Sequence, residues 1–557
     1  MKKNWVLNPK VYGAQTVAAD LKIHPAIAAI LLRRGLQSPA EIFNFLHPSL
    51  DALESPFAFQ DMQKAVDRIR LAVERGEKIL VYGDYDVDGI TGSSILYPVL
   101  KSLGADVRAH IPHRMNEGYG LNRESLQRLL AEDFKLVITV DNGITGADPI
   151  DYLNENGVDA IIVDHHKPKD RVPRAHAIVC AAVGDKKGDA NLAACGLALK
   201  LGWALLGSFE RVREYLDLVT LGTIADQAPV TGDNRILLKH GLPYLAQSPR
   251  VGLRALMEVS RIARKAVSYR DVAFSLGPRI NASGRMGSPE RAFRLLTTAD
   301  AAEARELAQS LDDGNRDRQR VEAAVFEEAA ERVERDFLSV EEKILVLESP
   351  DWHEGVLGII AARLVERYQK PAIVIALKEG LGKGSGRSVP AFSLFDTVLQ
   401  CETLLDSFGG HAQACGLSIK KENIGLFRQK LNDAARLTDL VGMVPLHIES
   451  ELPLNELDLQ FLKDLEMLAP FGPGNRKPLF LSRSLRLKGE AKKRGKDTLQ
   501  CWMTDERGKT TCEVVGFRSY ERWTTARGAG VYDIVYKPEL KEFQGLASIQ
   551  LELQDWT

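Results

Sequence analysis

Three apolar runs, separated by stretches long enough for a helix, constrain the fold of this chain most strongly. Residues 78–83 (KILVYG), 136–140 (LVITV) and 160–163 (AIIV) are apolar at successive positions rather than at alternate ones. Strands of this kind are covered on both faces, as in parallel sheets that carry helices on either side. Residues 51–240 are therefore predicted to form a doubly wound α/β domain around a parallel sheet.

Acidic residues follow directly after each of these runs. The first run leads into Asp84-Tyr-Asp86-Val-Asp88-Gly, the second into Asp141-Asn-Gly and the third into Asp164-His165-His166. Because the carboxyl ends of neighbouring strands in an open α/β sheet line one crevice, these side chains are expected to converge. Asp226, just beyond another apolar segment of the same domain, is a fourth candidate.

Crowded carboxylates of this kind indicate a site for cations. Leaving them unpaired in a cleft would cost several kcal/mol. Carboxylate and imidazole ligands suit manganese or magnesium better than a structural zinc. Two such ions about 3.5–4 Å apart can activate a water and neutralise both the attacking and the leaving oxygen of a phosphodiester. The pattern predicts phosphoryl transfer to water.

Each acidic motif also has a simpler interpretation. Asp-x-Asp-x-Asp-Gly opens an EF-hand loop as well, but here its twelfth position is Ile95 instead of Glu, and an apolar strand precedes it. Taken alone, Asp164-His-His fits a solvated loop that caps a helix equally well. The conjunction of four acidic sites at the ends of apolar segments favours a catalytic centre.

The rest of the chain changes character several times. Residues 1–50 resemble short helices broken by prolines, with no recognisable chemistry. Residues 300–337 predict a long exposed helix of roughly 50 Å that would act as a rigid arm, although Gly314 leaves two helices open as an alternative. A second α/β pattern runs from residue 343 to about 440, and polar and apolar residues alternate at 549–554, as in a small β-barrel.

Charge and cysteine usage exclude several classes of protein. A formal charge of -2 speaks against a protein that coats duplex DNA through overall positive charge, so any nucleic-acid site is local. The six cysteines form no C-x-x-C pair, which disfavours a zinc knuckle or a disulfide framework and fits a reducing cytosol. The first residues lack the apolar core of a signal peptide. Residues 195–209 are too short, and too polar at Lys200, to span a bilayer. A cytoplasmic protein without membrane attachment is expected.

In their order along the chain, the four acidic motifs resemble those of the DHH phosphoesterase superfamily, named for its Asp-His-His signature. The resemblance implies two divalent cations, with manganese preferred and magnesium as the alternative. It also implies that Asp141 and Asp226 bridge the cations, that His166 faces the scissile phosphate, and that Asp84 is a ligand or the partner of one. The implied metal ligands are Asp84, Asp86, Asp88, Asp141, His165 and Asp226, and the implied catalytic residues are His166, Asp164 and Asp84.

Motifs elsewhere in the chain are similar to those of the RecJ exonucleases within this superfamily. They lie at residues 111–120, 276–285, 352–364, 384–388, 409–416, 471–478 and 541–545. The resemblance implies an exonuclease specific for single-stranded DNA, which degrades it from the 5′-end to mononucleotides in DNA repair and recombination. It divides the chain into an N-terminal helical segment (1–50), a DHH domain (51–240), a helical extension with the connecting helix (241–337), a second α/β DHH-associated domain (338–442) and an OB-type barrel (443–557).

Several residues are candidates for binding phosphate or DNA. Glycines around Ser385, Arg387 and His411 let backbone amides approach an anion, although such glycines are equally typical of ordinary turns. Arg114 and Arg279 belong to the same pocket by resemblance, the alternative being surface arginines paired with carboxylates. The basic turn of Lys492, Lys493 and Arg494, with Trp502 nearby, is typical of a single-strand surface and also of a solvated loop.

The resemblance also implies partners, and two rival functions remain. Single-stranded DNA is the expected substrate, a helicase and a single-strand binding protein are the expected partners, and a monomer is the expected state. One rival is a hydrolase of short oligonucleotides or pyrophosphate, which would not need the C-terminal barrel. The other is a non-catalytic single-strand-binding scaffold, which the intact acidic motifs disfavour.

Overall fold

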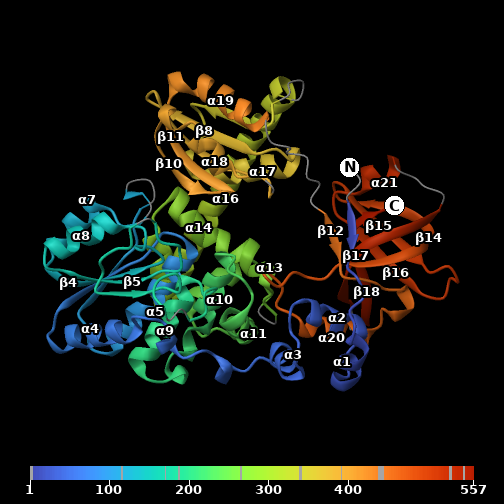
Figure 1. Ribbon diagram of the computed structural model, residues 1–557, viewed down its shortest axis with the longest axis horizontal. Helices are drawn as coiled ribbons and strands as arrows, with labels where there is room; N and C mark the ends of the chain where they lie inside the picture. Colours follow the sequence, from blue (N-terminus) through green and yellow to red (C-terminus); the bar gives the residue numbers. More distant parts are fainter. Residues whose placement is uncertain are drawn as a thin grey trace.

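The computed structural model describes residues 4–557 except 114–116, 119, 170, 186–187, 264–265, 338–341, 391, 437–444, 526–529 and 544–545. Figure 1 shows the chain as a first lobe (blue to green), a second lobe above it (yellow to orange) and a barrel beside them (red), with the N-terminal helices under the barrel.

A parallel sheet forms the centre of the first lobe, in the order β3-β2-β4-β5-β6. The three apolar runs of the sequence are its adjacent strands β2, β4 and β5, so the predicted doubly wound sheet is confirmed. Helices α4, α5 and α9 cover one face and α7 and α8 the other (Figure 1). The bounds are β2 Lys78–Tyr82, β3 Val107–His110, β4 Phe134–Val140, β5 Asp159–Val163, β6 Ala177–Val179, α4 Met62–Glu74, α5 Val87–Ser102, α7 Arg123–Leu130, α8 Ala147–Glu155 and α9 Ala194–Leu206.

The last helices of the DHH domain and the helical extension complete the first lobe and contribute to the same apolar core. They are α10 Leu216–Ala225, α11 Gly232–Ala246, α12 Val251–Val259, α13 Tyr269–Asp271, the π-helical turn η5 Val272–Leu276, α14 Gly277–Met286 and α15 Glu290–Thr297.

The predicted long helix is α16 (Ala301–Arg332), which continues through Gly314 without a break, so the alternative of two helices is excluded. It begins at Asp300, whose Oδ1 accepts a hydrogen bond from Ala302 N at 2.7 Å. The helix is less exposed than expected. Ala304 and Ala308 pack in the core of the first lobe, and Ala329 packs in a core of the second lobe. Helix α16 therefore packs into the apolar cores of both lobes.

A mixed sheet in the order β10-β11-β9-β8-β7 forms the second lobe. Strands β7 and β8 are parallel, and the other neighbours are antiparallel. The bounds are η6 Val333–Phe337, β7 Leu345–Ser349, η7 Glu354–Val356, α17 Leu357–Tyr368, β8 Ala372–Lys378, β9 Leu381–Arg387, α18 Leu394–Leu399, β10 Leu405–His411, β11 Ala414–Lys420 and α19 Ile424–Arg436.

The C-terminal sheet closes on itself as the predicted barrel, because β14 pairs with both β15 and β17. The alternating stretch at 549–554 lies on β18, where Leu551 and Leu553 are buried. The bounds are β13 Ser450–Glu451, α20 Leu459–Met467, β14 Phe480–Arg494, β15 Thr498–Thr504, β16 Thr511–Gly516, α21 Tyr520–Thr525, β17 Val531–Phe543 and β18 Leu546–Trp556.

The N-terminal helices α1 (Ala14–Leu21), α2 (Pro25–Arg33) and α3 (Pro39–Leu46) share one apolar core with this barrel. Strand β1 (Trp5–Leu7), which the sequence did not reveal, pairs in parallel with β12 (Leu446–Ile448). Trp5 Nε1 donates a hydrogen bond to Asp555 Oδ2 at 2.7 Å. Among the described helices, none alone has the length and apolar character of a membrane span; α1 and α2 have them only as a pair bent by 115°.

Helix α11 docks the barrel and the N-terminal helices onto the first lobe. The buried Arg235 guanidinium donates to Phe45 O, Met467 O and Leu468 O, at 2.8–3.1 Å. Lys239 Nζ donates to Ala469 O at 3.0 Å, and the His240 ring lies 2.8 Å from Pro48 O. Polar side chains of α11 thus bind carbonyl groups at the C-terminal ends of helices α3 and α20 and just beyond them.

Candidate metal centre and phosphate site

The first acidic motif lies where β2 passes into α5. Asp86 is the N-cap of α5, and its Oδ1 accepts hydrogen bonds from Asp88 N at 2.9 Å and Gly89 N at 3.2 Å. A Cβ on Gly89 would lie 2.5 Å from Asp84 N, so the motif requires glycine at its end. Asp84 and Asp88 are buried, and this tight turn holds the three carboxylates of the motif together.

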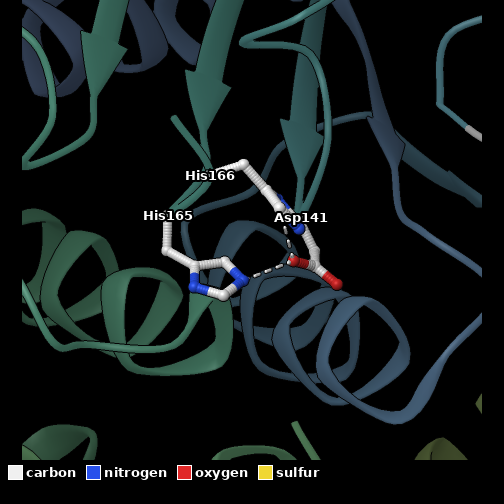
Figure 2. A group of neighbouring side chains, drawn as sticks. All are labelled: Asp141, His165 and His166. Carbon is white, nitrogen blue, oxygen red and sulfur yellow. Dashed lines mark ion pairs between the residues drawn. The ribbon is translucent and has the colours of Figure 1, made fainter. Parts of the chain in front are cut away.

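The second and third motifs meet at the ends of β4 and β5. Asp141 has a φ of 65°, in the left-handed region that non-glycine residues seldom adopt. Figure 2 shows both histidine rings turned toward its carboxylate. Asp141 Oδ1 lies 3.3 Å from His165 Nε2 and 3.8 Å from His166 Nδ1.

Asp88 and Asp226 complete the cluster around His165. His165 Nε2 lies 3.8 Å from Asp88 Oδ2 and 4.0 Å from Asp226 Oδ2, at the end of α10. All of the predicted ligands are brought together, in overlapping groups whose donor atoms lie within 4.8 Å of one another. These groups are Asp84, Asp86 and Asp141; Asp88, His165 and Asp226; and Asp141, His165 and His166.

The cluster fits divalent cations by its polar atoms and its charge. Within the described part of the chain, the buried atoms Asp141 Oδ1 and His165 Nε2 have no hydrogen-bond partner. Burial, together with the charges of Asp86, Asp88 and the other acidic neighbours, raises the pKa of Asp141 well above its usual range. Burial and the charges of Asp88 and Asp86 raise the pKa of Asp226 to about 8. A positive charge placed here would relieve both effects.

Asp164 is not a member of the three groups of potential metal ligands, but it binds His166. Its Oδ1 lies 2.7 Å from His166 Nδ1 and accepts from His166 N at 3.1 Å, while Oδ2 accepts from Ile144 N at 3.1 Å. Burial alone would lower the pKa of His166, but the hydrogen bond and charge of Asp164 outweigh it and raise that pKa to about 9. The His166 side chain is 41% exposed.

Helices α9 and α10 hold Asp88 in place. Its two carboxylate oxygens accept from Ala194 N at 2.7 Å and Cys195 N at 2.9 Å, in the first turn of α9. A Cβ on Gly222 of α10 would contact Thr91 Oγ1 and would lie 2.6 Å from Cys195 Sγ and 3.1 Å from Asp88 Oδ1. Asp88 has this position because α10 carries glycine at that point.

The candidate phosphate residues of the second lobe lie at one end of its sheet. Arg387 Nη1 donates to Ser385 Oγ at 3.2 Å and to Gly386 O at 2.8 Å. A Cβ on Gly358, in the first turn of α17, would be 3.0 Å from Arg387 Nη2 and 3.1 Å from Ser385 Oγ. His411 is exposed and pairs with Ala414, which in turn pairs with Arg387.

Arg279 does not join that site. Its Nε and Nη2 both lie 2.9 Å from Asp312 Oδ1 on α16, and Nη1 donates to Ser275 O at 2.8 Å. Arg285, which the sequence analysis passed over, lies at the other end of the same stretch and donates to Gly355 O at 3.1 Å. The signal that could have found it is a second arginine in the motif. Arg114 lies outside the described residues.

The basic turn lies on the barrel, away from the acidic cluster (Figure 1). Lys492, Lys493 and Arg494 end β14 and pair with the start of β15. Arg494 Nε donates to Gln500 Oε1 at 2.7 Å, and Lys493 Nζ lies 3.7 Å from Glu521 Oε1. Trp502 of β15 is 49% exposed. The hairpin thus presents positive charge beside an exposed aromatic ring.

Known protein families match most of the chain. Residues 78–223 match the N-terminal domain of the DHH family, residues 341–437 the DHHA1 domain and residues 448–555 the RecJ OB domain. The single-stranded-DNA-specific exonuclease RecJ of Bacillus subtilis (strain 168) is 34% identical over 567 residues, covering 100% of this chain and 71% of that protein.

Crystal structures of RecJ from Thermus thermophilus have the same fold. The complex with Mn²⁺ superposes with a TM-score of 0.84 at 31% identity and covers 100% of this chain and 79% of that one. The complex with Mg²⁺ gives a TM-score of 0.77 at 29% identity, with coverage of 99% and 78%. These matches confirm the resemblance seen in the motifs, and the chain belongs to the RecJ family of single-stranded-DNA-specific exonucleases.

Proposed function

We propose that this protein hydrolyses single-stranded DNA from its 5′-end and releases mononucleotides. The observation that carries the proposal is the pair of buried, mutually close atoms Asp141 Oδ1 and His165 Nε2, which lack hydrogen-bond partners within the described residues and stand among carboxylates. Membership of the RecJ family supports the choice of substrate, and the RecJ structures with Mn²⁺ and Mg²⁺ support the choice of cation.

The cluster would hold two divalent cations through Asp84, Asp86, Asp88, Asp141, His165 and Asp226. Asp141 and His165 each belong to two of the ligand groups, so both could contribute to more than one cation position, whereas Asp226 belongs to one group. When bound, the cations supply Lewis-acid activation of a water and neutralise charge on the reacting phosphate. The amides of α9 hold the orientation of the Asp88 carboxylate by hydrogen bonds to both of its oxygens.

His166 would meet the scissile phosphate from the open side of the cluster. Asp164 fixes the orientation of its ring and raises its pKa, which favours a protonated ring whose positive charge would stabilise the negative charge that develops on the phosphate. Asp164 therefore acts on the reaction through His166.

Attack from one end of the strand needs a site for that end. Ser385, Arg387 and the first amides of α17 offer an anion site of the kind that binds a terminal 5′-phosphate. Arg285 lies between this site and the first acidic motif and is a better candidate than Arg279, whose guanidinium is engaged by Asp312. His411 and Arg114 remain predictions.

The barrel would hold the strand between successive cuts. Lys492, Lys493, Arg494 and the ring of Trp502 fit the combination of backbone charge and base stacking by which single strands are bound. We further infer that a monomer acts in the cytosol, on strands that a helicase supplies and a single-strand binding protein covers.

The test uses a 5′-labelled single strand with Mn²⁺, with Mg²⁺ or with EDTA. We expect mononucleotides to appear first from the 5′-end with either metal and no reaction in EDTA. Asp141→Ala should abolish the reaction, whereas Asp148→Ala, a change of a 94% exposed side chain on α8, should not. Undiminished degradation by Asp141→Ala would refute the assignment, and release from the 3′-end would refute the polarity.

A further inference from the structure

Two glycines stand between the acidic cluster and the anion site. Gly284, near the end of α14, lies against the first acidic motif: a Cβ there would be 2.9 Å from the carbonyl oxygen of Tyr85, between Asp84 and Asp86. Gly355, in η7, lies against the next residue of α14: a Cβ there would be 2.9 Å from Arg285 O and 3.0 Å from His353 Nδ1.

These contacts form one continuous stack through the molecule. The main chain at Tyr85 touches Gly284, the main chain at Arg285 touches Gly355, and three residues further along the chain Gly358 touches Arg387 and Ser385. Arg285 Nη1 also donates to Gly355 O at 3.1 Å, which joins the two lobes directly. Because neither Gly284 nor Gly355 leaves room for a Cβ, the first acidic motif, α14 and η7 are already at their closest approach to one another.

Helix α14 and the segment before η7 are both attached to α16. Arg279 binds Asp312 and so fixes α14 to the first half of that helix. The buried Trp352 donates from Nε1 to Glu328 Oε2 at 2.8 Å and so fixes the segment before η7 to the second half. A continuous helix with both attachments prevents the two lobes from sliding past each other at this point.

We propose that Gly284 and Gly355 are positioning residues that set the separation between the metal centre and the anion site. This inference rests on the proposed function, in which the anion site takes a 5′-terminal phosphate. If the separation is fixed, a strand whose 5′-terminal phosphate occupies the anion site places one particular phosphodiester bond at the acidic cluster. The position of the terminal phosphate then determines which bond is cleaved. Recognition of the terminal phosphate and cleavage are thereby coupled through the distance that Gly284 and Gly355 set between the two sites.

The experiment compares 5′-phosphorylated and 5′-hydroxyl forms of one oligodeoxynucleotide, by kcat/KM for each, together with the Kd of Mn²⁺ by calorimetry. In Gly355→Ala the added methyl group displaces η7 and the start of α17. We expect the preference for the 5′-phosphate to fall by about tenfold or more, as for a misplaced contact, while the Kd of Mn²⁺ stays unchanged. Gly284→Ala presses on Tyr85 and should weaken Mn²⁺ binding as well.

Gly425→Ala, in the same lobe and with open space around its Cα, is the matched control and should retain the wild-type preference. If Gly355→Ala is poorly folded by circular dichroism, Trp352→Phe replaces it, since it removes the bond to Glu328 and keeps an aromatic ring. A folded variant with the same preference as the control would overturn the proposal.

If the wild-type enzyme degrades single strands without any preference for a 5′-phosphate, both the spacing role of the glycines and the phosphate site are refuted, while the nuclease function stands. Failure to degrade any single strand would refute the nuclease function itself.

Discussion

Asp141 combines a strained main chain with a buried carboxylate. A non-glycine residue in the left-handed region costs roughly 1–2 kcal/mol, and burial among other acids disfavours the charge. Such strain persists where the surroundings fix it, and it often accompanies function. In this conformation the carboxylate of Asp141 lies within 4 Å of a ring nitrogen of each histidine.

The pKa of Asp226 leads to a prediction for the metal-free protein. An unfolded aspartate ionises near 3.8, whereas the folded one does so at about 8. Between these values the folded state keeps a proton that the unfolded state has released, so stability should decline as pH rises from 4 to 8. Thermal unfolding in EDTA measures this, and Asp226→Asn should flatten the profile. A Tm that rises through this range in wild type but not in the variant would contradict the assignment.

Single residues also show where sequence reasoning ends. The cluster was predictable because its members follow strands of a parallel sheet, whose carboxyl ends must share an edge. The role of Arg279 was not, because two arginines six residues apart on one helix bind different partners, Asp312 of α16 for Arg279 and the carbonyl oxygen of Gly355 in the second lobe for Arg285.

At the scale of elements, α9 and α10 determine how Asp88 faces the cluster. We predict that Gly222→Ala lowers the affinity for Mn²⁺ by about tenfold to 100-fold, the range typical of disturbed metal-site support, because its Cβ would crowd Cys195 and Asp88. Gly202→Ala in α9 is the control, since its Cβ would make ordinary contacts at 3.5 Å with Val212 and Val99. Calorimetric titration with Mn²⁺ compares the two. Equal affinities would exclude a positioning role for Gly222.

Helix α16 provides a prediction about stability alone. Gly314 lies within the helix with no atom within 4 Å of where a Cβ would be. Gly314→Ala should raise the free energy of unfolding by about 0.5–1 kcal/mol, because alanine loses less backbone entropy in a helix. Denaturant titration measures the gain, and nuclease activity should not change. A loss of stability would indicate that the helix bends at this residue.

Helices and strands with strong periodicity were predictable, whereas short pairings between distant segments were not. Strand β1 is three residues long, and its partner β12 lies about 440 positions further along the chain. Nothing in three residues identifies such a partner, since the pairing follows from where α2 and α3 lie against the barrel.

At the scale of the whole molecule, Arg235 joins the barrel to the first lobe. It donates to main-chain carbonyls from two segments, and its burial, with the charge of Arg34, lowers its pKa to about 10. Arg235→Ala would leave buried carbonyls unsatisfied, at a cost of about 1–3 kcal/mol for each such group. We predict faster proteolysis between the first lobe and the barrel and weaker processivity on long strands, with hydrolysis of trinucleotides retained. Arg213→Ala, which changes an exposed arginine, is the control.

The order of the lobes along the chain followed from motifs, but their arrangement did not. Docking depends on single contacts such as Arg235 with Leu468 and Trp5 with Asp555, whose partners lie 233 and 550 positions apart. A sequence pattern reports periodicity within an element and carries no record of contacts at such separations.

The shared core of the first 50 residues and the barrel has a consequence for how the polypeptide is made. At about 5–20 residues per second, a ribosome needs roughly 20–90 s to travel from Trp5 to its β12 partner Leu446. For all of that time Ile27, Ile30 and Leu31 have no apolar surface of the barrel to cover them. We expect nascent chains to aggregate more readily during that interval, because transiently exposed apolar surface promotes association.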